Sequence, residues 1–131
     1  MTLFQLQIVT ADGLFFDGEA ESLLVRTIDG DVCILARHID YVTALGLGEA
    51  RVTVEGKARR AACMGGMLAV TNGQVRVVAS TFEWKEDIDV ARAQKALERA
   101  QATLSSGASD EEKRFADAAL KRAQVRLRIA Q

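Results

Sequence analysis

The chain of 131 residues has no proline, one histidine and two cysteines, Cys33 and Cys63. Two cysteines far apart in a chain without a recognisable secretory signal do not indicate a disulfide framework. Both lie in apolar, strand-like runs, so we expect two buried thiols that act as small hydrophobic residues. With so few histidines and cysteines, and no cluster of acids beside them, the sequence offers no ligand spacing typical of a metal site.

Long apolar runs and catalytic groupings are also missing. No stretch approaches the roughly 18 apolar residues of a membrane-spanning helix, and the first ten residues do not resemble a secretory signal. We therefore expect a cytosolic protein that reaches a membrane only through a partner. The sequence has no P-loop and no Ser/His/Asp or Cys/His grouping, so it does not predict an enzyme.

The charge is distributed unevenly along a chain of ordinary composition. Hydrophobic residues make up 49% and charged residues 27%, as in soluble globular proteins, and the net charge of −1 gives no general attraction to nucleic acid or to anionic membranes. Residues 1–87 hold 8 basic and 12 acidic side chains, whereas residues 88–131 hold 9 basic and 6 acidic ones. The C-terminal part is therefore better suited to an acidic partner or a phosphate.

The first two thirds of the chain read as short strands separated by turns. Apolar Phe4, Leu6 and Ile8 alternate with polar neighbours, which indicates a half-buried strand. The dipeptide Asn72-Gly73, between two apolar runs, is the strongest hairpin signal. About eight to ten short strands at regular spacing, with no helix among them, predict a sandwich or barrel. We expect this domain over residues 1–84.

The rest of the chain reads as two helices. The first is expected from about Ile88 to Leu104, with Asp87 as its N-cap, and the second from Asp110 to Ile129. Ser109, three residues before Glu112, predicts a capping box for the second helix. A short connection favours an antiparallel helix hairpin over residues 85–131. Its alanine-rich apolar stripes bury little area, which is typical of a part that can move.

The helical part carries four arginines in pairs. Arg92 and Arg99 share one helix face, and Arg122 and Arg126 share another. An antiparallel hairpin can bring the two faces together, and guanidinium groups suit phosphate oxygens. The alternative is that they are solvated or contact a protein partner.

Four segments together resemble one family. They are residues 4–13 with Phe16, Gly18 and Glu21; residues 29–45; residues 65–79; and the motif Ile88-Asp89-Val90-Ala91-Arg92-Ala93. In this order they resemble the epsilon subunit of the bacterial F-type ATP synthase, called delta in mitochondria, over nearly the whole chain. The family usually has Pro-Gly before the histidine and proline two residues after it, where this chain has Ala36, Arg37 and Asp40, and it usually has glycine at Cys33. The loop around His38 is therefore expected to differ in shape or charge.

The resemblance implies an α+β protein, with an N-terminal β-sandwich of about eight to ten short strands followed by a C-terminal antiparallel two-helix hairpin. It implies a non-catalytic subunit of the central stalk, peripheral to the cytoplasmic side of the bacterial membrane. The sandwich would bind the gamma subunit and the c ring, with His38 facing gamma and Asp31 facing the c ring. The hairpin would extend toward the alpha and beta catalytic subunits and inhibit ATP hydrolysis.

In some bacterial members of the family the folded hairpin binds ATP, so the resemblance also implies a regulatory ligand, although no cofactor is required. Glu83, Asp89 and Ala93 would lie by the adenine, with Ile88 in the same motif. The phosphates would face four arginines: Arg92, Arg99, Arg122 and Arg126.

Two other functions remain open from the residues. One is a free-standing cytosolic nucleotide-sensing β-sandwich module, which would not co-purify with a large membrane-bound ATPase. The other is a small-molecule enzyme on a β scaffold, which an activity assay on the isolated chain would detect.

Overall fold

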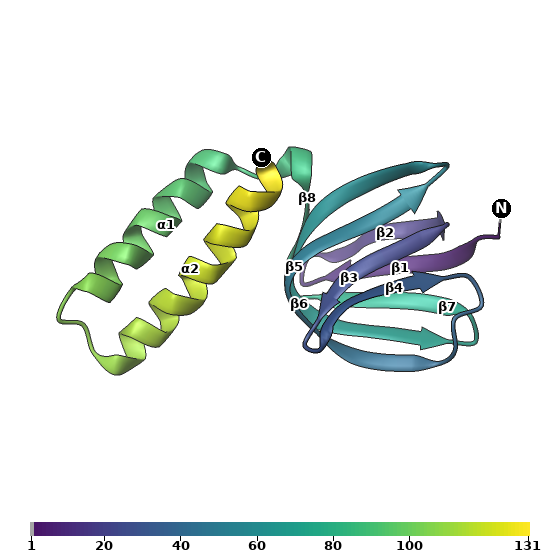
Figure 1. Ribbon diagram of the computed structural model, residues 1–131, viewed down its shortest axis with the longest axis horizontal. Coiled ribbons are helices and arrows are strands. Elements are labelled where there is room, and N and C mark those ends of the chain that lie inside the picture. The colour runs from purple at the N-terminus through teal and green to yellow at the C-terminus, as the bar shows by residue number, and fades with distance from the viewer. Residues whose placement is uncertain (1) are drawn as a thin grey trace. The chain divides into compact units, whose positions relative to one another are not determined.

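A computed structural model describes residues 2–131, and these divide into two compact units (Figure 1). The first unit ends at Lys85 and consists of strands, whereas the second begins at Glu86 and contains two α-helices. A short 3-10 helix, η1 (Lys85–Asp87), lies at the boundary. The expected α+β class, with strands first and helices second, is confirmed.

The first unit contains eight strands within the described residues. They are β1 (Phe4–Thr10), β2 (Gly13–Ala20), β3 (Ser22–Thr27), β4 (Gly30–Leu35), β5 (Tyr41–Val54), β6 (Lys57–Thr71), β7 (Gln74–Ala79) and β8 (Phe82–Trp84). They pair in the order β2-β1-β7-β6-β5-β3-β4, with β8 also on β6, and only β1 with β7 is parallel. Buried side chains of β1, β3, β4 and β7 share one core, so the sheet folds over on itself and the predicted sandwich is confirmed.

One strand is longer than expected. Gly48 predicts a break, but β5 runs through it for 14 residues. Gly65-Gly66 predicts a bulge or a close approach within a strand that continues, and β6 does continue through both glycines for 15 residues. The close approach is confirmed, because a Cβ atom on Gly66 would lie 2.0 Å from the Val78 carbonyl oxygen. The two strands pair from Tyr41 opposite Val70 to Val54 opposite Lys57. Gly48 thus does not end β5, because β6 continues to supply its hydrogen-bond partners.

The prediction of two buried thiols is right for one cysteine only. Cys63 is buried in the sandwich, and burial raises the pKa of its thiol to about 12. Cys33 is exposed. It lies on the edge strand β4, where the side chains of Val32 and Ile34 on either side of it point toward the core, so the alternation of the strand turns the thiol outward.

The helices begin close to the predicted residues but with a different first cap. Helix α1 (Val90–Ser105) is capped by Asp89, whose carboxylate accepts a hydrogen bond from the Arg92 amide at 3.0 Å. The predicted cap, Asp87, is wrong because η1 occupies its position and α1 starts later. Helix α2 (Asp110–Ala130) is capped by Ser109 as expected, with its hydroxyl oxygen 3.2 Å from the Glu112 amide.

An aromatic cluster fixes the last strand of the sandwich. The Trp84 ring on β8 lies 5.5 Å from each of the Phe15 and Phe82 rings, and the Arg59 guanidinium carbon lies 3.8 Å above it. Such ring pairs and cation–π contacts add to the energy of simple burial. The short strand β8 is therefore firmly held just before the second unit begins.

Glu49 joins β5 to β6 through an ion-pair network. Arg60 Nε donates to Glu49 Oε1 at 2.9 Å, and Arg51 donates to the other carboxylate oxygen. Burial raises the pKa of the Glu49 carboxyl, but the hydrogen bonds and charges of Arg60 and Arg51 outweigh it and hold the pKa below its usual value. The carboxylate thus stabilises the fold at neutral pH, and this contribution is lost as pH falls through the lowered pKa.

We expect Glu49→Gln to lower the free energy of unfolding by about 1 kcal/mol at pH 7, because it replaces a charge-assisted contact with a neutral one. The difference from the original chain should shrink as the pH is lowered, since the carboxylate itself becomes protonated. Urea unfolding at pH 7, 5 and 3 measures both effects. Glu19→Gln, on an exposed glutamate of β2, is the control. A loss of stability independent of pH would show that charge is not the cause.

Candidate functional site

The helix hairpin is built around a seam of alanines. Ala93 and Ala100 on α1 and Ala116 and Ala123 on α2 are buried, and each pair is seven residues apart, on one face of its helix. The two helices lie side by side and run in opposite directions (Figure 1). Small side chains let the helices approach closely, but they bury little apolar surface. The alanines themselves therefore contribute little apolar burial, although α2 also buries the larger Val125 and Ile129.

Three arginines, Arg92, Arg99 and Arg122, each immediately precede an alanine of this seam. One residue turns an α-helix by about 100°, so each arginine is rotated away from the seam in the same sense. Equal rotations in the same sense on two antiparallel helices point to the same side of the pair. Arg126 follows Arg122 by one turn and joins them. We call this surface, made by the four residues, the arginine side of the hairpin.

Most of the arginine side is exposed to solvent. Arg92, Arg99 and Arg122 are exposed, and Arg126 is half-buried. Arg92 near the start of α1 and Arg126 near the end of α2 lie at the same end of the antiparallel pair, whereas Arg99 is about 10 Å further along α1. Several guanidinium groups within such a distance repel one another unless an anion lies between them, and they suit a chain of phosphates.

The other residues expected at a nucleotide site have structural roles or lie in the first unit. Ile88 and Ala93 are buried, Ala93 within the alanine seam. The Asp89 carboxylate caps α1. Glu83 belongs to β8 of the first unit and is half-buried. Contact of these four residues with an adenine ring stays a prediction.

The two residues expected to face protein partners lie in different elements, Asp31 in β4 and His38 in the loop that follows it. Asp31 is the second residue of β4. Its carboxylate forms an ion pair with the guanidinium of Arg26 on the neighbouring strand β3, with 3.5 Å between Oδ1 and Nη1 and both side chains exposed. His38 follows the end of β4, with its Nδ1 donating to the Ile39 carbonyl at 2.7 Å and its ring beside Tyr41. That bond leaves Nε2 as the acceptor of the neutral ring.

The loop around His38 contains two features that sequence reasoning missed. Arg37 has a φ of 65°, in the left-handed region that favours glycine, and it stands where the family usually has glycine. Asp40, where the family usually has proline, accepts a hydrogen bond from the Asn72 amide at 2.9 Å. A side-chain bond to the β6–β7 turn thus fixes the loop here without proline.

An apolar outer face on the sandwich was also missed. Val42 of β5 is 64% exposed, and Met67 of β6 and Val78 of β7 are 46% exposed each. Met67 lies opposite Ala44 and Val78 in the adjacent strands. Val42 lies two residues before Ala44 and so projects from the same face of β5, which joins the three exposed side chains into one patch. The signal was present in the sequence, because alternation places Met67 and Val78 on the face opposite the buried residues of β6 and β7.

Residues 2–131 contain no group of three or more His, Cys, Asp or Glu side chains arranged to hold a metal ion. Neither helix in this part of the chain is both long and apolar enough to cross a membrane.

Comparisons with known proteins cover both units. Residues 3–85 match the model of the beta-sandwich domain of the ATP synthase delta/epsilon chain, and residues 86–131 match that of its long alpha-helix domain. The ATP synthase epsilon chain of Caldicellulosiruptor bescii is 37% identical over 131 residues, 100% of this chain and 96% of the relative. That of Shouchella clausii is 38% identical over 130 residues, 99% of this chain and 96% of the relative.

A solved structure is similar as well. A chain in the mitochondrial ATP synthase of Euglena gracilis, described as containing OSCP, F1 and the c-ring, has a TM-score of 0.83 and 25% identity. The match covers 95% of this chain and 79% of that one.

Proposed function

The chain belongs to the delta/epsilon family of ATP synthase subunits, and we propose that it couples the catalytic head to the membrane rotor and regulates ATP hydrolysis. It is a component of that complex and not one of its catalytic subunits. In this proposal the sandwich binds the gamma subunit and the c ring of the central stalk. The helix hairpin is the regulatory part, and the chain associates with the membrane peripherally through these partners.

The apolar outer face is the main support for the proposed binding of the sandwich to a protein partner. Three large apolar side chains, Val42, Met67 and Val78, are exposed together on adjacent strands. Contiguous exposed apolar surface on a soluble domain is characteristic of a protein-binding site. The adjoining loop adds Ile39, which is 78% exposed. We assign this surface to gamma, because the His38 loop lies next to it, and we assign Asp31 to the c ring.

Met67→Glu is expected to weaken binding of the chain to the gamma subunit at least tenfold, because it places a carboxylate in an interface that excludes water. The fold should persist, since Met67 points away from the core. Calorimetric titration with gamma from the same organism measures the affinity, and thermal unfolding checks the fold.

Leu14→Glu is the matched control, because Leu14 of β2 is also an exposed apolar residue but lies outside the patch. His38→Ala should weaken gamma binding, and Asp31→Arg should weaken assembly with the c ring. If Met67→Glu and Leu14→Glu bind gamma equally well, the outer face is not the contact. A chain that fails to co-purify with the ATP synthase would instead support a free-standing nucleotide sensor.

For the hairpin, the proposal is that ATP binds on its arginine side and stabilises the folded pair of helices. The four arginines lie on one side only while α1 and α2 are paired, so a polyphosphate binds that arrangement preferentially. A ligand shifts a conformational balance by its differential affinity for the two states. At a concentration 100 times its dissociation constant, ATP stabilises the folded form by about 2.7 kcal/mol.

Loss of ATP would release the helices from their weak alanine seam. The freed arm carries basic side chains, including Lys121 and Arg128, that can meet acidic surfaces of the alpha and beta subunits and inhibit hydrolysis. The nucleotide is thus a regulatory ligand in this proposal, with Ile88, Asp89 and Ala93 on the adenine side.

A further inference from the structure

Arg37 adopts a backbone conformation that its local sequence does not require. Only three residues other than glycine have positive φ among residues 2–131: Arg37, Glu55 and Asn72. Glu55 and Asn72 each begin a two-residue hairpin with glycine, and such turns demand positive φ at both positions. Arg37 lies in the longer connection between β4 and β5. Unfavourable backbone of this kind persists where the surroundings hold it, often at functional sites.

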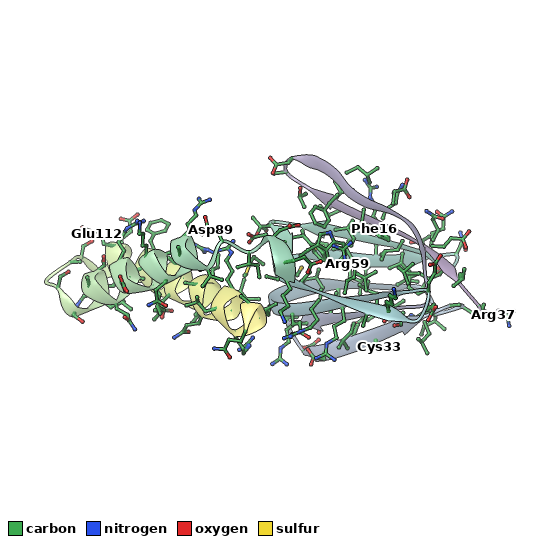
Figure 2. The ribbon with its side chains drawn as sticks, turned by 90° about the horizontal axis from the view of Figure 1, so that it is seen from above. Phe16, Cys33, Arg37, Arg59, Asp89 and Glu112 are labelled. Atoms are coloured by element: carbon green, nitrogen blue, oxygen red, sulfur yellow. The ribbon has the colours of Figure 1, made fainter. Side chains whose placement is uncertain are left out.

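Hydrogen bonds on both sides of Arg37 hold the loop in shape. The His38 amide donates to the Leu35 carbonyl at 3.3 Å, and the Asp40 carboxylate accepts from the Asn72 amide at 2.9 Å. In Figure 2 the Arg37 side chain lies at the edge of the sandwich and points away from it. The loop therefore fixes the direction in which the Cα–Cβ bond of Arg37 leaves the sandwich.

The guanidinium has no ion-pair partner among the described residues, and the loop that carries it borders the apolar outer face. Ile39, two residues on, is the most exposed of the large apolar side chains, and Val42 follows it on β5. Interfaces of this type have an apolar centre and a polar rim, and arginine is enriched in them.

We propose that Arg37 is a specificity-determining contact that pairs with a carboxylate of the gamma subunit at the rim of the outer face. This inference rests on the proposed binding of gamma to the outer face, and it adds that the residue of gamma opposite Arg37 is acidic. A guanidinium that leaves the loop from a fixed backbone position favours an acidic group within its reach, and the strained backbone is retained because it directs the side chain toward the rim.

The test is Arg37→Gly, because stability and binding should move in opposite directions. Glycine relieves the unfavourable φ, so the melting temperature should rise or stay the same. Affinity for gamma should nevertheless fall about tenfold at low salt, because the charge-assisted contact is lost. The loss should be smaller at 0.5 M salt, where exposed charges are screened. A residue that only shaped the loop would not give this combination.

Glu55→Gly is the matched control, since it relieves the same backbone conformation at the opposite end of β5 and should leave gamma affinity unchanged. Arg37→Glu should bind more weakly than Arg37→Gly. If Arg37→Gly binds gamma as tightly as the original chain while Met67→Glu binds weakly, the inference about Arg37 is wrong and the gamma-binding face stands. If neither variant changes the affinity, the proposed function of the outer face fails as well.

Discussion

Gly66→Ala is expected to lower the free energy of unfolding by about 4 kcal/mol or more, a large share of the stability of a small domain. A Cβ atom on Gly66 would lie 2.0 Å from the Val78 carbonyl oxygen and 2.8 Å from the Ala79 Cα atom. Both contacts are with the backbone of β7, which pairs with β6 on one side and β1 on the other. The strand has no room to move without breaking its hydrogen bonds.

The matched control is Gly30→Ala. Gly30 has a φ of 120°, close to the 128° of Gly66, but nothing lies within 4 Å of the Cβ that alanine would add. Its substitution should therefore lower the free energy of unfolding only through the unfavourable positive φ of alanine, by about 1–2 kcal/mol. Urea unfolding of both variants, followed by circular dichroism, compares the two. Equal losses of stability would show that the contact with β7 is not what makes Gly66 necessary.

The double variant Arg99→Ala with Arg122→Ala is expected to reduce ATP affinity at least a hundredfold. Each substitution removes a charge-assisted contact to phosphate, worth about 1.5–3 kcal/mol. Both side chains are exposed, so the hairpin itself should survive. Titration calorimetry with ATP measures the affinity. Arg114→Ala, on an exposed arginine that helix geometry places away from the arginine side, should leave the affinity nearly unchanged.

Asp89 needs a different substitution from alanine. Because its carboxylate caps α1, Asp89→Ala removes about 1 kcal/mol of helix stability whether or not a nucleotide binds. Asp89→Asn keeps a capping oxygen and removes the charge, so the two variants separate capping from ligand contact. If the double arginine variant binds ATP as tightly as the original chain, the arginine side does not bind the nucleotide.

Local rules determined most of the secondary structure and the capping of α2 from sequence alone. Asn72-Gly73 forms the expected hairpin because few residues other than asparagine and glycine adopt positive φ easily. Ser109 caps α2 because its hydroxyl reaches an amide only three residues away. The four arginines could be paired by face from their spacing, since helix periodicity is a property of the sequence.

Tertiary structure decided the features that depend on distant neighbours. β5 runs through Gly48 because β6 supplies its hydrogen-bond partners, which no local pattern records. Cys33 is exposed because the core covers only the face of β4 that carries Val32 and Ile34, and which face is covered depends on the strands packed against it. The loop around His38 holds its shape without proline because Asp40 reaches Asn72, 32 residues away in the chain. The physical reason is the same in each case, because the deciding partner lies on a segment that only folding brings near.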